Sequence, residues 1–444
     1  MNDIMRSAAV RDIAQQAKSI AQKLANLDTD TKNQLLLHIR DNIQKNRDSI
    51  TNANARDVTA AKRMVEEGTL TPPLLSRLVL SEAKINQLST YLEEVAKLDD
   101  PVGKKQFAMK LADDMILTRV SCPIGVVAII FESRPEVVIQ VTALSLKSGN
   151  VVILKGGSEA GHSNRVLFEL IEQVLETYHL QGAVNLIETR EDVAGLLQQD
   201  DLIDLIIPRG SNAFVRYIQD NTKIPVLGHS SGICHVYLDE DCDRQKAVSV
   251  TLDAKLDYPS ACNAVETLLV HEKIVETVLP ELLMELKKNN IRLIGCEQSC
   301  PIAHRLKIDM EPASDDDWQT EYSDLILAIR IVPSIVEAVS HINSYGSHHT
   351  DSIITENTAA ADYFLKQVDS ACVFHNVSTR FSDGYVFGLG AEVGISTNKT
   401  HSRGPVGLEG MVIYKYLLRG NGQIRGAFSG KSGLPFLHVP LPLD

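Results

Sequence analysis

A cysteine at position 262 lies where the sequence predicts a break between a helix and a strand. Residues 257–271 read DYPSACNAVETLLVH, and Pro259 cannot continue a helix because its ring removes the amide hydrogen and restricts the preceding residue. An accessible thiol in such a break is a candidate nucleophile, since sulfur forms thioesters with acyl groups. The alternative is that Cys262 is a small buried hydrophobic residue, the commonest role of a free cysteine.

Two glycine-bearing turns, each after an apolar run, have the residue types that hold an anion or a nucleotide. VVILKGGSEA contains Lys155, Gly157 and Ser158, and LIIPRGSN contains Gly210 and Ser211. Backbone amides in such a turn, followed by a helix, favour negative charge. Neither turn has the G-x-G-x-x-G pattern, and each taken alone is better explained by relief of backbone strain. Two such turns in one parallel-sheet domain favour a dinucleotide.

The elements that must position these residues predict a doubly wound α/β fold. Residues 7–66 have the apolar spacing of helices. From about residue 115, apolar runs such as NVVILK alternate with amphipathic segments such as LFELIEQVLETYHL, which is typical of a parallel sheet covered on both faces. The alternation restarts near residue 229, which predicts a second α/β domain, and EKIVETVLPELLMELKKNN within it predicts one long helix. MVIYKYLLRG near the end is an extended segment suited to pairing with another subunit.

Composition limits the partners of this protein. The chain has 444 residues, more than one hydrophobic core usually fills, and its net charge of -13 argues against binding to nucleic acid or to an anionic membrane surface. The first residues contain no basic segment followed by an apolar stretch, and no long apolar window follows, so we expect a cytoplasmic protein with small-molecule partners. Seven scattered cysteines fit neither a disulfide framework nor zinc-ligand spacing, so no metal is expected.

Several longer segments resemble the aldehyde dehydrogenase superfamily and, within it, the γ-glutamyl phosphate reductases. These segments are CPIGVVAIIFESRPEVVIQ, SGNVVILKGGSEA, IPRGS, YPSACNAVETLLVH, AVSHINSYGSHHTDSI, STRFSDGYVFGLGAEVGIST and HSRGPVGLEGM. The resemblance implies that Cys262 is the nucleophile, that Lys155 and Ser158 hold the adenosine ribose, and that Gly210 and Ser211 lie beside the nicotinamide.

The same resemblance implies three structural units. We expect a Rossmann-like cofactor domain over residues 1–228, with part of 100–122 in a small β oligomerisation arm. A catalytic α/β domain over residues 229–405 carries Cys262, and a C-terminal segment over 406–444 completes the arm and makes a homo-oligomer.

Two departures from the superfamily favour reduction with NADPH. Oxidising members carry a glutamate that activates water for thioester hydrolysis; here the matching segment is LGHSSGICHVYLD, with His229 or a neighbour at that place and no carboxylate. NAD-preferring members carry a glutamate that binds the ribose 2′-hydroxyl, whereas this chain has Ser158, which favours NADPH with Lys155 as a counter-charge. Ser158 could instead be a helix cap.

Further site residues are expected from the matched segments. The superfamily's oxyanion-hole asparagine falls near Ser133, so Asn263 is a possible substitute as the donor. Glu321 lies close to the family's glutamate that binds the cofactor ribose. For the charged end of the substrate, the candidates besides Ser133 are Arg134, Asn376 and Arg380, because a carboxylate or phosphate favours a forked guanidinium. Either arginine could instead belong to a structural ion pair.

The resemblance implies NADPH-dependent reduction of L-γ-glutamyl 5-phosphate to L-glutamate 5-semialdehyde, the second step of proline synthesis from glutamate. A glutamate 5-kinase would then be a separate protein, with transient contact between the two. The rivals are an oxidising aldehyde dehydrogenase, which should have a carboxylate near residue 229 and a glutamate at position 158, and a cofactor-binding protein that has lost catalysis. The first rival does not fit Ser158 or the absence of a carboxylate near residue 229. The second does not fit residues 257–271, where the segment around the cysteine is intact.

Overall fold

The computed structural model describes residues 2–210, 212–228, 231–429 and 433–443. The first part of the chain is helical, as its apolar spacing predicts. Asp28 accepts a hydrogen bond from the backbone nitrogen of Thr31, and Ser81 caps a later helix in the same way, so polar side chains fix where two of the helices begin. The helices are α1 (Asn2–Ala25), α2 (Thr29–Lys45), α3 (Arg47–Glu66), α4 (Pro72–Leu78) and α5 (Glu82–Lys97).

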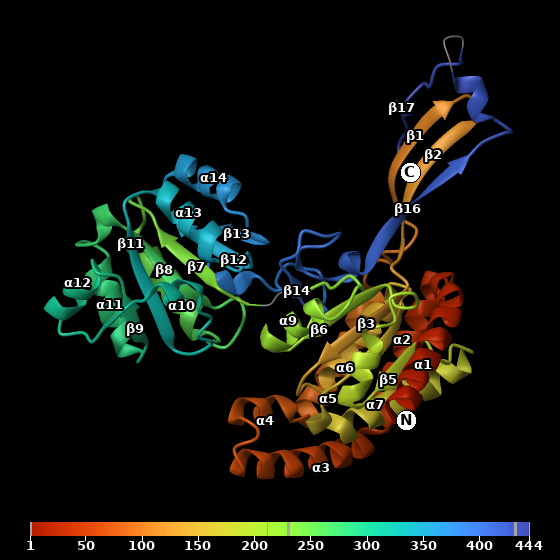
Figure 1. The fold of residues 1–444 in the computed structure, drawn as a ribbon, viewed down its shortest axis with the longest axis horizontal. Coiled ribbons are helices and arrows are strands. Elements are labelled where there is room, and N and C mark those ends of the chain that lie inside the picture. Colours follow the sequence, from red (N-terminus) through yellow and green to blue (C-terminus); the bar gives the residue numbers. More distant parts are fainter. Residues whose placement is uncertain (1, 211, 229–230, 430–432, 444) are drawn as a thin grey trace.

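The first lobe is built on a parallel sheet in the order β5-β4-β3-β6, which helices cover (Figure 1). Every residue of β3 and β4 is buried, and this explains their uninterrupted apolar sequences. The strands are β3 (Val126–Phe131), β4 (Val151–Lys155), β5 (Val184–Ile187) and β6 (Leu205–Arg209). The helices are α6 (Glu136–Lys147), η1 (Ser158–Ala160), α7 (Gly161–Thr177), α8 (Arg190–Leu196) and α9 (Asn212–Asp220).

The second lobe has a parallel seven-stranded sheet in the order β10-β9-β11-β8-β7-β12-β13. Its strands are β7 (Cys234–Leu238), β8 (Val265–His271), β9 (Arg292–Gly295), β10 (Glu311–Pro312), β11 (Ile326–Val332), β12 (Thr350–Ile354) and β13 (Cys372–His375). Its α-helices are α10 (Arg244–Leu256), α11 (Leu279–Lys288), α12 (Cys300–Arg305), α13 (Ile335–Tyr345) and α14 (Thr358–Gln367). Three short 3-10 turns complete it, η2 (Glu272–Ile274), η3 (Asp315–Gln319) and η4 (Thr379–Phe381).

The single long helix expected after β8 is wrong in its extent. The structure divides that segment into η2 and the ten-residue α11. Pro280 lies in the first turn of α11, where its missing amide hydrogen costs nothing, and it therefore marks a helix start rather than an interior position.

The chain returns to the first lobe after the second sheet is complete. Two-residue strands β14 (Ile395–Ser396) and β15 (Gly404–Pro405) pair with each other, and η5 (Leu408–Met411) follows. Ala391, Val393 and Val406 belong to the same buried core as the first sheet. The packing therefore assigns part of the expected 229–405 unit to the first lobe, although that segment comes late in the sequence.

An antiparallel sheet projects from the two lobes as an arm (Figure 1). It joins two distant segments of the chain, because β16 pairs along its whole length with β2. Its strands are β1 (Lys105–Ala112), β2 (Met115–Pro123), β16 (Val412–Arg419) and β17 (Val439–Pro440), with the turn η6 (Arg425–Phe428) near the tip.

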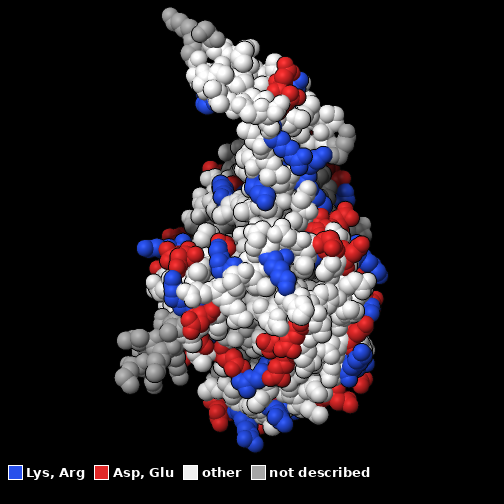
Figure 2. Space-filling view, turned by 90° about the vertical axis from the view of Figure 1, so that its right-hand side faces the viewer, with Lys and Arg blue, Asp and Glu red and all other residues white. Residues whose placement is uncertain are grey.

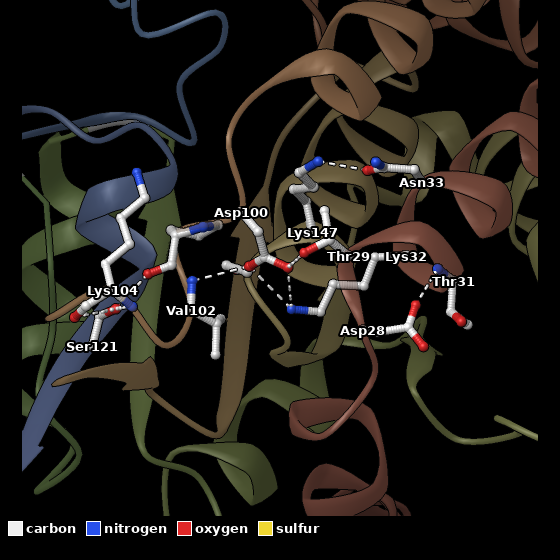
Figure 3. Close-up of polar contacts among 12 residues, drawn as sticks. Asp28, Thr29, Thr31, Lys32, Asn33, Asp100, Val102, Lys104, Ser121 and Lys147 are labelled. Atoms are coloured by element: carbon white, nitrogen blue, oxygen red, sulfur yellow. Dashed lines mark hydrogen bonds and ion pairs between the residues drawn. The ribbon is translucent and has the colours of Figure 1, made fainter. Parts of the chain in front are cut away.

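Asp100 anchors the base of the arm to the helices of the first lobe (Figure 3). Its carboxylate accepts hydrogen bonds from Lys32 Nζ at 2.9 Å, Thr29 Oγ1 at 3.0 Å and the backbone nitrogen of Val102 at 2.9 Å. The Lys32 side chain is only 1% exposed, so the pair is well shielded from water. Loss of the Asp100 carboxylate would leave this ammonium buried without its counter-charge, which typically costs about 3–5 kcal/mol.

Acidic and basic side chains are interspersed over the face shown in Figure 2, whereas the arm at its top carries few charges. Within the ranges that the structure describes, no helix has the length and apolarity needed to cross a membrane. The same residues include no cluster of three or more His, Cys, Asp or Glu side chains able to hold a metal ion.

Candidate active site

A cleft of about 690 Å³ lies between the two lobes, and six of the twelve site residues predicted from the sequence line it. Two contacts join its walls: Asn212 Nδ2 of α9 donates to Glu321 Oε2 at 2.6 Å, and Arg77 Nη2 of α4 donates to the hydroxyl of Tyr258 at 3.4 Å. Of the residues predicted for the site, the cleft is lined by Arg134, Gly210, Cys262, Asn263, Glu321 and Arg380.

Cys262 is the cysteine that lines this cleft. It lies between α10 and β8 in consecutive turns, in which the backbone nitrogen of Ala261 donates to the oxygen of Tyr258 at 3.0 Å and that of Ala264 donates to the oxygen of Ala261 at 3.0 Å. The residue is partly exposed, in contrast to the fully buried strand that follows. The break predicted around Pro259 therefore presents Cys262 at the cleft.

The backbone of Cys262 is held closely by the segment that leads into β7. Cys234 Sγ lies 3.3 Å from the carbonyl oxygen of Cys262 and donates its hydrogen to it. Burial raises the pKa of Cys234, so this second thiol stays protonated and acts as a donor. Gly232 packs against the same carbonyl, and a Cβ there would lie 2.1 Å from the oxygen, which leaves no room for a side chain.

Asn263 is engaged at both ends of its carboxamide. Its Nδ2 donates to the carbonyl oxygen of Ser382 at 2.9 Å, and its Oδ1 accepts a hydrogen bond from Arg380 Nη1. The side chain is 5% exposed. In this arrangement Asn263 connects the turn that carries Cys262 to residues 380–382, and its role as an oxyanion donor stays a prediction.

The two arginines predicted for the substrate differ in their partners. Arg380 forms an ion pair with Asp257, Nε to Oδ2 at 3.0 Å, so part of its charge is neutralised inside the protein. Arg134 follows β3, and burial together with the charges of Arg209 and Arg77 lowers its pKa. The repulsion among these guanidinium groups makes Arg134 the better candidate for an anionic ligand.

The turn after β4 carries the first set of residues predicted to hold a nucleotide. Lys155 ends β4, and Ser158 is exposed at the first position of η1. Glu159 next to it turns inward: its Oε1 accepts from the backbone nitrogen of Ser133 at 2.7 Å and from the Ser133 hydroxyl at 2.5 Å. A Cβ at Gly157 would lie 2.1 Å from Glu159 Oε1, so the glycine allows this inward turn.

This arrangement leaves no projecting carboxylate beside Ser158. It also occupies the hydroxyl of Ser133, which is 2% exposed, so a direct contact between Ser133 and the substrate stays a prediction.

The second predicted turn lies on the cleft beside residues of the other lobe. Gly210 follows β6, and a Cβ there would lie 2.9 Å from Glu132 Oε2. Glu321 reaches this region from the second lobe through its hydrogen bond to Asn212. The predicted neighbour Ser211 and His229 both lie outside the described residues.

Asn376 is absent from the residues that line the cleft. It has a positive φ of 57°, which asparagine tolerates better than most residues, and its carboxamide bonds to the backbone nitrogen and oxygen of Thr355, at 3.0 and 2.9 Å. In the structure its amide therefore holds the end of β12, and its proposed contact with substrate stays a prediction.

Sequence analysis did not single out Arg77, Tyr258 or Glu266. Arg77 is in a short helix whose composition does not distinguish it, and Tyr258 stands out in the sequence only as a neighbour of Pro259 in the segment that carries Cys262. Glu266 could have been identified from the sequence, because a carboxylate inside the apolar run AVETLLVH would be buried and would need a partner. The structure supplies Lys255 Nζ at 2.7 Å, with both side chains fully buried, and burial raises the pKa of Glu266.

Proteins of known family resemble this chain over nearly its whole length. The model of the aldehyde dehydrogenase family matches residues 4–293. A γ-glutamyl phosphate reductase from Natronomonas pharaonis is 50% identical over 422 residues, which cover 95% of this chain and 95% of that protein. One from Picosynechococcus sp. is 50% identical over 431 residues, 97% of this chain and 99% of that protein. The crystal structure of a γ-glutamyl phosphate reductase from Thermotoga maritima covers 94% of this chain and 99% of its own, with 39% identity and a TM-score of 0.89.

Proposed function

Because this chain belongs to the aldehyde dehydrogenase family and, within it, to the γ-glutamyl phosphate reductases, we propose that it reduces L-γ-glutamyl 5-phosphate with NADPH through a thioester on Cys262. The product is L-glutamate 5-semialdehyde, and the reaction is the second step of proline synthesis from glutamate. The observation that carries this proposal is the position of Cys262, partly exposed on a cleft that both lobes line.

The thiol of Cys262 suits the acyl transfer. Its sulfur attacks the acyl carbon of the acyl phosphate, the bond from that carbon to the phosphate oxygen breaks, and the electron pair leaves with the phosphate. The thiol proton ends on the released phosphate, so the step is balanced as thiol plus acyl phosphate giving thioester plus hydrogen phosphate. A thioester remains electrophilic enough to be reduced, whereas an ester of serine would be a poorer acceptor.

The residues around the predicted nucleotide site fit NADPH. Members of the aldehyde dehydrogenase family use a nicotinamide cofactor, which supplies the hydride when bound. Lys155 and Ser158 would hold the ribose that carries the 2′-phosphate, and Glu159 is held inward by Ser133, so its carboxylate is directed away from that phosphate. Gly210 and Glu321 would lie on either side of the nicotinamide half.

The test runs the reaction in reverse, because the acyl phosphate is labile. Purified protein is mixed with glutamate 5-semialdehyde, inorganic phosphate and NADP, and the absorbance of NADPH is followed. We expect formation of NADPH that depends on phosphate, since phosphate must resolve the thioester. Equal rates with and without phosphate would mean that water resolves it, and the protein would then be an oxidising aldehyde dehydrogenase.

The arm suits a homo-oligomer. Seven of the eight residues of β16 are exposed, and the side chains of Tyr414, Tyr416 and Leu418 are 52%, 55% and 57% exposed. Among the described strands, β16 is the outer strand of its sheet, so one of its edges has no partner in the chain. Apolar surface and a free edge on a projecting element are suited to a second copy of the chain. Transient contact with a glutamate 5-kinase stays a prediction.

A further inference from the structure

Three guanidinium groups of the first lobe converge on the cleft without a carboxylate partner. Arg77 lies in α4, Arg134 follows β3 and Arg209 ends β6, and all three line the cleft. Among the described residues, none of the three forms an ion pair, whereas Arg380 across the cleft is paired with Asp257. A cluster of like charges is unfavourable by itself and becomes favourable when an anion binds between its members.

Four carboxylates line the cleft, those of Glu132, Glu321, Asp383 and Glu392, and among the described residues none of them forms an ion pair with Arg77 or Arg134. The last three have other partners. Glu321 accepts its hydrogen bond from Asn212, and Glu392 Oε2 accepts one from the backbone nitrogen of Gly384 at 2.9 Å. Asp383 Oδ1 accepts from the backbone nitrogen of Tyr385 at 2.9 Å. Each of these acids is therefore oriented by a group other than Arg77 or Arg134.

The hydroxyl of Tyr258 completes the cluster from the second lobe. It accepts a hydrogen bond from Arg77 Nη2, although the two residues are 181 positions apart in the sequence. Burial acts to raise the pKa of Tyr258, but hydrogen bonds from Arg77 and Ser260 and the charges of Arg77 and Arg134 lower it. The Nε of Arg77 is buried and has no hydrogen-bond partner in the described structure, so this guanidinium has a donor still to satisfy.

Tyr258 also places the cluster next to the nucleophile. The carbonyl oxygen of Tyr258 and the nitrogen of Ala261 close a turn, and Cys262 is the next residue. In an acyl phosphate, the phosphate is attached to the carbon that the sulfur attacks, whereas the α-carboxylate of a glutamyl group is several bonds away. An anion subsite on the cleft that Cys262 lines therefore suits the phosphate.

We infer that Arg77 and Arg134, together with the Tyr258 hydroxyl, form the subsite that receives the phosphoryl group of the substrate and the phosphate released from it. The inference rests on the proposed function and names the groups that bind its leaving group. As the carbon–oxygen bond breaks, negative charge grows on the leaving oxygen, and the two guanidinium groups stabilise it. The hydroxyl of Tyr258 donates a hydrogen bond to the same phosphate.

The inference is tested in the reverse reaction by varying phosphate at saturating semialdehyde, and then semialdehyde at saturating phosphate. We expect Arg77→Gln and Arg134→Gln each to raise the KM for phosphate by about tenfold or more, the usual effect of losing a charge-assisted hydrogen bond, and to change the KM for semialdehyde by less than about twofold. Arg77→Lys should raise the KM for phosphate by less than Arg77→Gln does, because lysine keeps the positive charge but lacks the planar guanidinium that donates two parallel hydrogen bonds. Tyr258→Phe should raise the KM for phosphate by several-fold.

Arg56→Gln is the matched control, since Arg56 is exposed on the neighbouring helix α3. It should leave both KM values unchanged. Broadening of the phosphorus-31 resonance of inorganic phosphate by the enzyme gives a binding measurement independent of turnover, and Arg77→Gln should reduce it. Circular dichroism melting identifies any variant that fails to fold, and Arg77→Lys and Tyr258→Phe then carry the test.

The outcomes separate the inference from the function on which it rests. A rise in the KM for semialdehyde instead of phosphate would assign the arginines to the α-carboxylate and overturn the inference. Unchanged KM values in all variants would overturn it as well, while phosphate-dependent turnover by the wild type would still support the function. If the wild type turns over equally well without phosphate, the function itself fails.

Discussion

The Cys262 sulfur is held in the cleft through its backbone. Among the described residues, no side chain forms a hydrogen bond with the Cys262 sulfur, and the contacts that fix it come from Cys234 and Gly232 to its backbone. Arginines line the same cleft, and they come from other segments of the chain than Cys262. In the proposed function, the group that reacts is therefore separate from the groups that bind charge.

Replacing the sulfur tests the residue directly. We expect Cys262→Ser to lower the turnover number by about a thousandfold or more, because a serine hydroxyl is a far weaker nucleophile at neutral pH. NADPH binding, measured by fluorescence titration, should be unchanged within about twofold. Cys234→Ser is the comparison, since it keeps a small donor beside the Cys262 carbonyl and should lose far less activity. Substantial turnover by Cys262→Ser would refute the nucleophile assignment.

The choice of cofactor is expected to depend on Ser158. A glutamate at this exposed position would repel the 2′-phosphate, so Ser158→Glu should weaken NADPH binding by about tenfold or more and NADH binding by less than about threefold. Both dissociation constants are measured by fluorescence titration. Ser158→Ala removes the hydroxyl without adding charge and serves as the control. Equal weakening of both cofactors would contradict the role given to Ser158.

At the scale of elements, the segment before β7 positions the turn that carries Cys262. Strands β7 and β8 are neighbours in a parallel sheet, so the segments that precede them lie together at one edge. Gly232 precedes β7 and Cys262 precedes β8, and the two backbones approach so closely that a Cβ at Gly232 would lie 2.5 Å from the Cα of Cys262. The position of the sulfur therefore depends on a residue that is not among those lining the cleft.

Gly232→Ala should displace the turn that carries Cys262. A shift of about 1 Å at a reacting atom costs on the order of a hundredfold in rate, so we expect kcat to fall by about tenfold to a hundredfold while NADPH binding is retained. Steady-state kinetics and thermal melting together distinguish displacement from unfolding. Gly426→Ala on the arm is the control, because its added methyl group would meet no atom within 4 Å. Unchanged kcat in Gly232→Ala would show that the turn tolerates the added methyl group.

At the scale of the molecule, two lobes define the cleft and a separate arm carries the exposed apolar surface. The Asp100 network fixes the arm to α2, and β16 enters it directly after residues that pack in the first lobe (Figures 1 and 3). Because the arm and the first lobe share continuous segments of chain, oligomerisation through the arm would set the position of the first lobe.

Charges on the arm should separate the proposed oligomer. Tyr416→Glu combined with Leu418→Glu places two carboxylates on the exposed face of β16, and we expect a shift toward monomers in light scattering after size-exclusion chromatography. Met284→Glu changes an apolar side chain that is 52% exposed on α11, and should leave the assembly unchanged. An unchanged mass in the double variant would contradict assembly through β16.

Stability should fall in acid because of a histidine buried in the second lobe. Burial and the charges of His235 and Arg330 lower the pKa of His341 to about 2, and neither ring nitrogen has a hydrogen-bond partner in the described structure. The unfolded chain binds a proton near pH 6.5, and the folded chain binds it only near pH 2. Stability therefore decreases as the pH falls from about 6.5, by up to about 1.4 kcal/mol per pH unit.

His341→Phe should reduce this dependence. The ring packs edge-on to Trp318 and lies against Tyr345, so phenylalanine fits the surroundings and has no proton to gain. Melting temperatures of the two proteins, measured from pH 7.5 to pH 5, should diverge as the pH falls, with the variant losing less. Parallel curves would show that other groups control the acid sensitivity.

The sequence by itself determined the local features of this protein. Continuous apolar runs predicted the parallel strands, because β3 and β4 are covered on both faces and have no polar side to show. Pro259 marked the break that presents Cys262. The family followed from long matched segments, which depend on residue order alone and need no knowledge of contacts.

Only the tertiary structure decided which side chains are already engaged. Two arginines were equivalent candidates in the sequence, yet Arg380 is paired with Asp257 and Arg134 is not. Glu159 lies beside Ser158 in the chain, but its carboxylate turns to Ser133. Arg77 meets Tyr258 across 181 positions. Hydrophobic periodicity is a property of neighbouring residues, whereas the partner of a charge depends on how distant segments pack, and this packing determines which charges remain available to a ligand.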